Sequence, residues 1–322
     1  MAIFQTQLRI LGRRSLLGVL ALLATLSAGH LATTAQNSGS PKVVATFLPM
    51  YMFTKGVIGS TGNVEVLVPP NAEVHGYQAS PGNVRTLSQS GVLVKNGLGM
   101  EEFLERLIAN AGNSQLKQID ASQGITAIES DHHDHEGHDD HGDHHDHGAE
   151  HHHEEGNPHV WLDPVLAQKQ VANIRDGLIA ADSANASAYR ANASAYIQKL
   201  QQLDQEFKTR LASAQGCQII AFHDAYPYLA KRYGIQQMAV VELPEDSLSP
   251  QDIQRVSKAV QQSPVKALFS EPGISDSRIQ QIASDVGVPV KILDPIEVGP
   301  LDPQYYFTAM RKNLNNLVEA CQ

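Results

Sequence analysis

The segment from Asp131 to Glu155 concentrates metal-binding side chains more than any other part of the sequence. Its 25 residues include eleven histidines and ten acidic residues, with only glycine and alanine between them. Imidazole and carboxylate groups side by side suit Zn²⁺ first among the common metals. We therefore expect an auxiliary metal-collecting loop, whose histidines are His132, His133, His135, His138, His141, His144, His145, His147, His151, His152 and His153.

This loop cannot form a tight metal site by itself. It has no lysine, arginine or branched aliphatic residue, so it has nothing to bury, and we expect it to be disordered. An expression tag would not be internal and mixed with acids, and a plain acidic linker would not need histidines. Because tight binding needs ligands fixed by a fold, we expect a second, rigid site beside the loop.

Four histidines lie outside the loop, namely His30, His75, His159 and His223. His30 falls in an apparent leader, whereas His75 and His223 each follow a predicted strand, as does Asp294. Ligands of parallel α/β sheets bind beyond the carboxyl ends of the strands. Three imidazoles and a carboxylate make a four-coordinate shell for Zn²⁺, so we predict a site formed by His75, His159, His223 and Asp294. The competing interpretation is that each histidine is simply hydrogen-bonded in the fold, and that Asp294 is a turn residue before a proline.

The elements that would hold these residues follow an alternating pattern of strands and helices. Apolar runs at 42–47, 64–68 and 91–95 are separated by helical stretches, and the same alternation resumes at Gln218 after two helices. Such alternation predicts parallel sheets flanked by helices. We expect two α/β lobes, each with a roughly four-stranded sheet, and the following domains: a signal peptide at 1–35, an N-terminal lobe at 41–162 that includes the loop 131–155, helices at 163–214, and a C-terminal lobe at 215–322.

One predicted helix is long enough to join the two lobes. From about 183 to 214 there is no proline or glycine, and apolar residues recur at helical spacing. At 1.5 Å per residue, this helix would be roughly 45 Å long. We expect it to bridge both lobes and to resist bending between them.

The N-terminus and the cysteines indicate export. Three arginines precede the apolar run from Leu16 to Leu26, which is too short for an ordinary transmembrane helix, so we predict a cleaved signal peptide and a periplasmic protein. An uncleaved anchor is the alternative. No cysteine follows the apolar run, which argues against a lipoprotein. In an oxidising compartment, Cys217 and Cys321 are expected to form a disulfide, although two separate thiols remain possible on sequence grounds.

The charge balance excludes some classes of partner. The net charge of −10 comes from the loop, because the rest of the chain balances 24 basic residues against 24 acidic ones. No basic patch stands out, so nucleic-acid binding is not expected. No second apolar segment of membrane length occurs, and we expect a monomer without a membrane span in its mature form.

Several stretches of the sequence resemble one protein family. They include LVPPNAEVHGYQASPGNVRTLSQS, NPHVWLDP, AFHDAYPYLAKRYGI and ILDPI, and together they cover nearly the whole mature chain. The chain resembles the metal-binding proteins of bacterial ABC importers for zinc and manganese, the cluster A-I or cluster 9 solute-binding family. The resemblance implies two α/β lobes bridged by one rigid helix, with the metal between them, and a membrane permease as partner.

The resemblance also implies which residues bind the metal. His75, His159 and His223 match the first three ligand positions of the family, and Asp294 matches the fourth. Zinc-type members carry histidine at the third position, where manganese-type members typically carry glutamate, and the histidine-rich loop is likewise a mark of the zinc type. In some zinc members a carboxylate near the first histidine, here Glu73, or a water completes the shell instead.

We therefore predict a high-affinity zinc-binding protein that delivers Zn²⁺ to an ABC permease. The alternatives are a manganese- or iron-binding protein of the same family, a periplasmic zinc buffer or chaperone that relies on the loop, and a surface adhesin. The sequence contains neither H-E-x-x-H nor G-x-S-x-G, so we do not expect an enzyme.

Overall fold

The computed structural model describes residues 40–129, 156–241, 249–262, 265–273 and 277–322. The predicted signal peptide and the loop 131–155 lie outside the described residues. The described residues all belong to one compact unit, 39–322.

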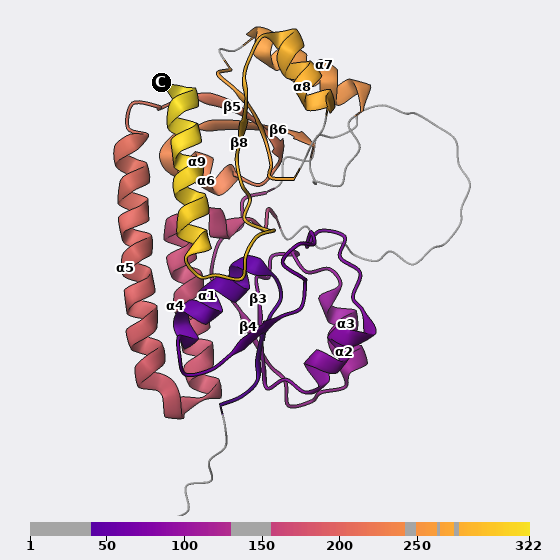
Figure 1. The fold of residues 1–322 in the computed structure, drawn as a ribbon, viewed down its shortest axis with the longest axis vertical. Coiled ribbons are helices and arrows are strands. Elements are labelled where there is room, and N and C mark those ends of the chain that lie inside the picture. The colour runs from indigo at the N-terminus through magenta and orange to yellow at the C-terminus, as the bar shows by residue number, and fades with distance from the viewer. Residues whose placement is uncertain (1–39, 130–155, 242–248, 263–264, 274–276) are drawn as a thin grey trace, which may run out of the picture. The chain divides into compact units, whose positions relative to one another are not determined.

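Strands and helices alternate along most of the described chain (Figure 1). The strands are β1 (Val43–Ala45), β2 (Val64–Val66), β3 (Val92–Lys95), β4 (Lys117–Asp120), β5 (Gln218–His223), β6 (Gln236–Val241), β7 (Leu268–Ser270) and β8 (Val290–Ile292). The helices are α1 (Leu48–Ile58), α2 (Pro81–Ser88), α3 (Leu104–Ala111), α4 (Pro164–Ala181), α5 (Ala186–Arg210), α6 (Pro227–Tyr233), α7 (Pro250–Gln262), α8 (Ser277–Val286) and α9 (Tyr305–Cys321), with short 3₁₀ helices η1 (Val160–Leu162) and η2 (Ser183–Asn185).

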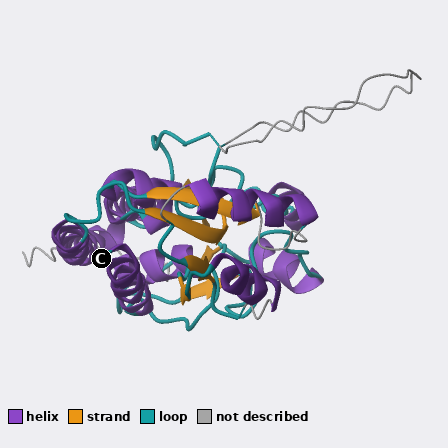
Figure 2. Cartoon of the chain, turned by 90° about the horizontal axis from the view of Figure 1, so that it is seen from above, coloured by secondary structure: helices purple, strands orange, loops and turns teal. Residues whose placement is uncertain are grey.

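The strands form two parallel sheets with the same internal order. One sheet runs β2-β1-β3-β4 and the other β6-β5-β7-β8, and helices lie on both sides of the strands (Figure 2). The register pairs Val43 with both Val64 and Val92 in the first sheet, and Leu268 with Val290 in the second. The expected two four-stranded sheets flanked by helices are confirmed. In each sheet the strand order switches sides between β1 and β3 or between β5 and β7, and ligands of parallel sheets bind at such a switch point.

Local signals in the sequence explain where the helices begin. Ser80 caps α2 with a hydroxyl that accepts from the backbone of Asn83, and Pro81 takes the first helical position. Asp163 caps α4 in the same way before Pro164. Gly234 ends α6 in a left-handed conformation that glycine adopts without strain.

The long helix α5 connects the two halves through packing. It contacts α1 from the first half and α9 from the second, and it runs beside both (Figure 1). Its buried face includes Tyr189, Tyr196, Leu203 and Phe207, which belong to one apolar cluster that also contains residues of both sheets. The helix is shorter than the predicted 183–214, because η2 precedes it and the last helical residue is Arg210.

A disulfide joins Cys217 to Cys321, as expected from the sequence, with Cα atoms 5.7 Å apart. It ties the end of α9 to the residue before β5. Within the described ranges, no helix combines the length and the apolar character needed to cross a membrane.

Candidate metal centre

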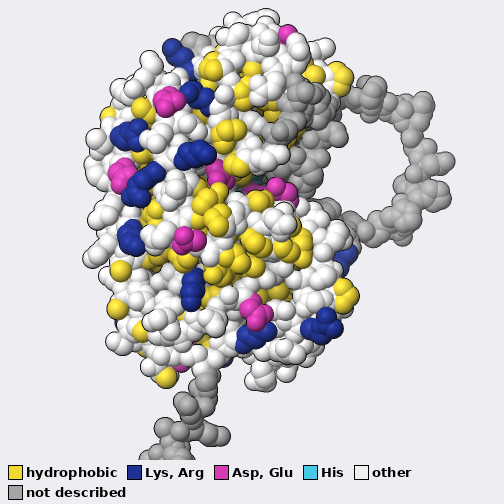
Figure 3. Space-filling model, viewed as in Figure 1, with side chains coloured by type: hydrophobic (Ala, Val, Ile, Leu, Met, Phe, Trp, Pro, Cys, Tyr) yellow, Lys and Arg dark blue, Asp and Glu magenta, His cyan; other side chains and the backbone are white. Residues whose placement is uncertain are grey.

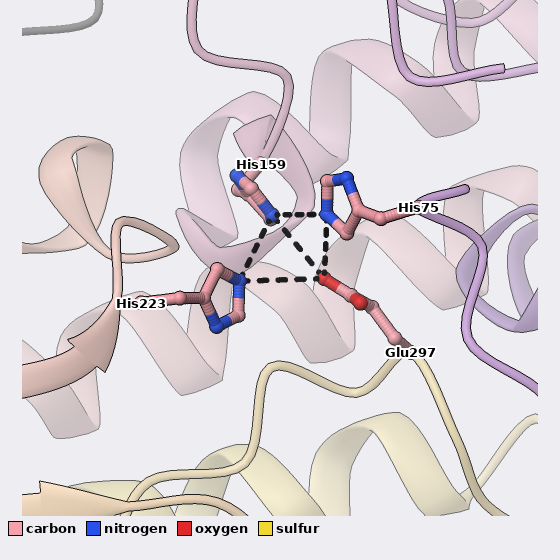
Figure 4. Close-up of side chains that lie close together, drawn as sticks. All are labelled: His75, His159, His223 and Glu297. Atoms are coloured by element: carbon pink, nitrogen blue, oxygen red, sulfur yellow. Dashed lines mark hydrogen bonds and ion pairs between the residues drawn. The ribbon is translucent and has the colours of Figure 1, made fainter. Parts of the chain in front are cut away.

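Three histidines and one glutamate converge between the two sheets (Figure 4). His75 lies in the loop between β2 and α2, and His159 directly precedes η1. His223 is the last residue of β5, and Glu297 follows β8. Each sheet therefore contributes residues from beyond the carboxyl ends of its strands, so a group held here is held by both halves of the protein.

The four side chains present one ligand atom each toward a common point. Nε2 of His159 lies 3.2 Å from Nε2 of His75, 3.3 Å from Nε2 of His223 and 3.2 Å from Oε1 of Glu297. The same carboxylate oxygen lies 3.6 Å from Nε2 of His75 and 3.8 Å from Nε2 of His223. A tetrahedron whose bonds are about 2.0–2.1 Å long has edges of about 3.3 Å. The spacing thus matches a four-coordinate zinc ion.

Asn157 fixes the ring of His159. Its side-chain oxygen lies 3.0 Å from Nδ1 of that ring and also accepts from the backbone N–H of His159 at 3.1 Å. The side-chain amide of Asn157 donates to the backbone oxygen of Asp224 at 2.6 Å and to its carboxylate at 3.1 Å, so the amide oxygen must face the histidine. Nδ1 therefore carries the proton, and Nε2 is left to bind a metal.

Glu271 fixes the ring of His223 in the same manner. The carboxylate of Glu271 accepts a hydrogen bond from Nδ1 of His223, which directs Nε2 toward the other ligands. Burial opposes a positive charge on His223, but the charges of Glu271 and Glu297 outweigh burial and raise its pKa to about 9. Burial lowers the pKa of His159 to about 3, so that ring is neutral at physiological pH.

Glu297 is a buried carboxylate that lacks ordinary partners. Its side chain is 1% exposed, and neither carboxylate oxygen has a hydrogen-bond donor of good geometry within the described part of the chain. Burial raises the pKa of Glu297, but the adjacent rings of His159 and His75 lower it well below its usual range. A buried charge without hydrogen bonds is costly unless a cation balances it. The carboxylate is thus arranged to bind a positive ion.

The centre is almost closed to solvent. The side chains of His159 and His223 are 2% and 0% exposed, and His75 is the most exposed of the four residues at 8%. Hardly any histidine surface is visible on the face drawn in Figure 3, where acidic side chains lie between the two halves. An ion at the centre would therefore be largely dehydrated.

The structure brings together three of the four residues predicted as ligands, and it places Asp294 elsewhere. The carboxylate of Asp294 accepts from the hydroxyl of Tyr305 and from the backbone N–H of Ile296, both at 2.7 Å. Glu297, three residues further on, occupies the fourth position. The sequence signal for Glu297 was its place in the same loop after the last strand, but Asp294 is the first acidic residue there.

Glu73 is not among the four converging side chains of the described residues. Glu73 is an exposed residue, and partial burial of its carboxyl together with the charges of Glu297 and Glu271 raises its pKa to about 7. It therefore lies near the centre without belonging to the four converging side chains. The predicted metal-collecting histidines fall within 131–155, outside the described residues.

Residues 43–320 match the model of one protein family, described as zinc-uptake complex component A, periplasmic. Among curated proteins, the chain is 32% identical over 283 residues to the high-affinity zinc uptake system protein ZnuA of Bacillus subtilis, and the match covers 86% of each chain.

A second relative is the zinc-binding lipoprotein AdcA of Streptococcus pneumoniae, which is 33% identical over 309 residues. This match covers 92% of the present chain but 59% of AdcA, so the chain spans about three fifths of that relative. The crystal structure of Zn(II)-bound AdcA from Streptococcus pneumoniae has a TM-score of 0.72 at 29% identity, over 88% of this chain and 58% of that one.

Proposed function

The chain belongs to the ZnuA family of periplasmic zinc-uptake components, and from this premise we propose that it captures Zn²⁺ and delivers it to an ABC importer in the membrane. The observation that carries the proposal is the near-tetrahedral set of three imidazole nitrogens and one carboxylate oxygen. His75, His159, His223 and Glu297 are the proposed ligands.

The chemistry of this set favours zinc over manganese. Imidazole nitrogen suits zinc, whereas Mn²⁺ is better served by carboxylate, carbonyl and water oxygens. Zinc also accepts four-coordinate tetrahedral geometry without penalty, whereas oxygen-rich octahedral shells need more ligands than the four that converge here. The centre offers three nitrogens and one oxygen, and its spacing leaves room for a small ion with short bonds.

The same geometry favours binding without turnover. Catalytic zinc sites keep one position open for water or substrate, while sites closed by four protein groups bind the metal without activating a water. Four side chains already surround the centre, and they are nearly closed to solvent. We propose a solute-binding protein rather than an enzyme.

The route to the membrane extends this proposal. The leader at 1–35 would direct export, and the mature protein would act in the periplasm as a monomer that docks on a permease. The loop 131–155 would raise the local concentration of zinc without forming the tight site. The two lobes, with predicted boundaries at 41–162 and 215–322, would hold the ion between them.

Zinc titration calorimetry tests the proposed ligands. Three proteins are compared: the exported form, a variant that lacks residues 131–155, and His223→Ala. We expect the exported form and the deletion variant to keep one tight site with a stoichiometry of one. His223→Ala should lose tight binding, because only three of the four proposed ligands remain.

The opposite result would favour a different function. A zinc buffer or chaperone would depend on the loop, so the deletion would abolish tight binding and His223→Ala would not. A manganese protein would bind Mn²⁺ tightly when Mn²⁺ is titrated alone, which is the informative measurement because most protein sites prefer Zn²⁺ to Mn²⁺ in direct competition. Either result would overturn the proposed capture of zinc at the four-residue centre.

A further inference from the structure

Glu297 directly follows a three-residue segment, 294–296, in which the backbone of each residue makes a hydrogen bond. The side chain of Asn313, on α9, pairs with the backbone of Asp294: it accepts from the N–H and donates to the carbonyl oxygen, both at 2.8 Å. The indole N–H of Trp161 donates to the carbonyl oxygen of Pro295 at 2.8 Å. The backbone N–H of Ile296 donates to the Asp294 carboxylate at 2.7 Å.

The conformation of Ile296 needs this support. Its φ of 64° lies in the left-handed region, which β-branched residues rarely adopt. The residue is also fully buried, so the strain is not relieved at a flexible surface loop. Strained backbone of this kind persists only where the surroundings hold it in place, and it gathers at functional sites. Here the strained residue immediately precedes the carboxylate ligand.

Asp294 is the residue that holds the turn from within. One carboxylate oxygen accepts from Ile296, and the other accepts from the hydroxyl of Tyr305 at 2.7 Å, which fixes the side-chain rotamer of Asp294. Both oxygens are therefore engaged in hydrogen bonds. Glu297 differs, because neither of its carboxylate oxygens has a hydrogen-bond donor of good geometry among the described residues.

We propose that Asp294 is a positioning residue, which locks the left-handed turn at Ile296 and thereby aims the carboxylate of Glu297 at the metal. The sequence suggested Asp294 as a metal ligand, whereas its contacts in the structure assign it the role of orienting a neighbouring ligand. This inference rests on the proposed zinc site and adds the device that orients its fourth ligand.

Two substitutions at Asp294 separate positioning from direct ligation. Asp294→Ala removes the acceptor for Ile296 and should weaken zinc binding about ten- to a hundredfold, as is usual for groups that orient a metal ligand. Asp294→Asn keeps a side-chain oxygen that accepts from Ile296, so it should bind zinc almost as tightly as the wild type. Substitution of a direct ligand would give equal losses in both variants, and that result would overturn the proposal.

A matched control lies nearby in the chain. Asp302 accepts from the backbone N–H of Gln304 at 2.9 Å, which is the same contact two residues ahead, but Asp302 is exposed. Asp302→Ala should leave zinc affinity unchanged. Unfolding temperatures of the metal-free proteins show how far each variant is destabilised apart from its zinc affinity.

A double-mutant cycle with Glu297→Ala gives the decisive test. If Asp294 acts through Glu297, Asp294→Ala should cause no further loss of affinity once Glu297 has been removed. The absorption spectrum of bound Co²⁺ should also change in Asp294→Ala and match that of Glu297→Ala. An equal loss in both backgrounds would mean that Asp294 supports the fold generally, and the inference would be wrong.

Should Asp294→Ala fail to fold, Tyr305→Phe provides the same test with a smaller change. Tyr305→Phe removes only the hydroxyl that fixes Asp294. As a single substitution it should lower zinc affinity a few-fold, and in a protein that already carries Glu297→Ala it should cause no further loss. If Tyr305→Phe alone binds zinc as tightly as the wild type, that result would count against the proposal. If instead the wild type and His223→Ala bind zinc equally weakly, the proposed function itself fails.

Discussion

His223 differs from His159 at the centre because it carries a proton that zinc must displace. The carboxylate of Glu271 accepts from Nδ1, and the pKa of His223 is raised to about 9 by Glu271 and Glu297 against the effect of burial. His159, with a pKa lowered to about 3 by burial, is already neutral. A zinc ion needs the lone pair on Nε2 of His223, and that nitrogen is protonated in the free protein at neutral pH.

Zinc binding should therefore release about one proton from His223 between pH 7 and 8. Over this range, below the raised pKa, affinity should increase about tenfold for each unit of pH, and the increase should level off above pH 9. Binding enthalpies measured in buffers of different ionisation enthalpy give the number of protons released. Release of none would show that His223 is neutral before the metal arrives.

Glu271→Gln is the matched variant for this prediction. The amide oxygen can still accept from Nδ1 of His223, but the negative charge that raises the pKa is gone. Proton release at pH 7.5 should therefore fall, while the ring keeps its orientation. The same release in the wild type and in Glu271→Gln would contradict the assignment of the proton to this pair.

At the scale of elements, the segment from Gly156 to His159 places the ring of His159 between the two sheets. The phenol of Tyr228, on α6, donates to the backbone oxygen of Asn157 at 2.6 Å and accepts from the N–H of Ile128 at 3.0 Å. The N–H of Asn157 donates to the carbonyl oxygen of Ile128 at 2.8 Å. Residues 128 and 157 are thus tied together and to the second half of the protein.

Asn157→Ala should weaken zinc binding about ten- to a hundredfold, because the ring of His159 loses the acceptor that fixes its tautomer. Tyr228→Phe should have a smaller effect, since it keeps the bond from Asn157 to the ring. Competition with a chelator of known affinity measures both. Asn173→Ala is the control. The side-chain amide of Asn173 donates to the carbonyl oxygens of Ala121 and Gln123, away from the centre, so zinc affinity should not change. Equal losses at positions 157 and 173 would count against a specific role.

Much of this architecture is readable from the sequence because its signals are local. Apolar strand-like runs, Ser80-Pro81 at a helix start and Gly234 at a helix end all act within a few residues, and the structure has the elements near those places. The three histidines could be found because they are few and two of them follow strands.

Glu297 could not be chosen in the same way. Glu297 joins the three histidines just after a left-handed turn at Ile296, and an isoleucine in the sequence does not predict such a turn. The turn is held by Asn313 and Trp161, which are distant in sequence from the loop. Periodicity and spacing in a sequence report on interactions between residues close in the chain. The position of Glu297 is instead determined by tertiary contacts.

At the scale of the whole described unit, the two sheets share one apolar core and one long helix. The helix α5 packs on α1 and on α9, and the disulfide between Cys217 and Cys321 ties α9 to the start of β5. α9 also carries Asn313, which holds the segment before Glu297. A change in the angle between the sheets would have to break these contacts together, so loading and release of the metal should be local.

Removal of zinc with a chelator tests this rigidity. Hydrogen exchange should increase around His75, His159, His223 and Glu297, because these loops lose the ion that joins them, while exchange in the middle of α5 should change only through global stability. That global term is calculable, since free zinc at a thousand times its Kd adds about 4 kcal/mol to the free energy of unfolding. Comparison at matched stability, set with a low concentration of urea, isolates the local effect. Faster exchange along the faces of α5 that contact α1 and α9 would instead indicate a hinge, and delivery to the permease would then proceed by opening of the two halves rather than by release through the loops.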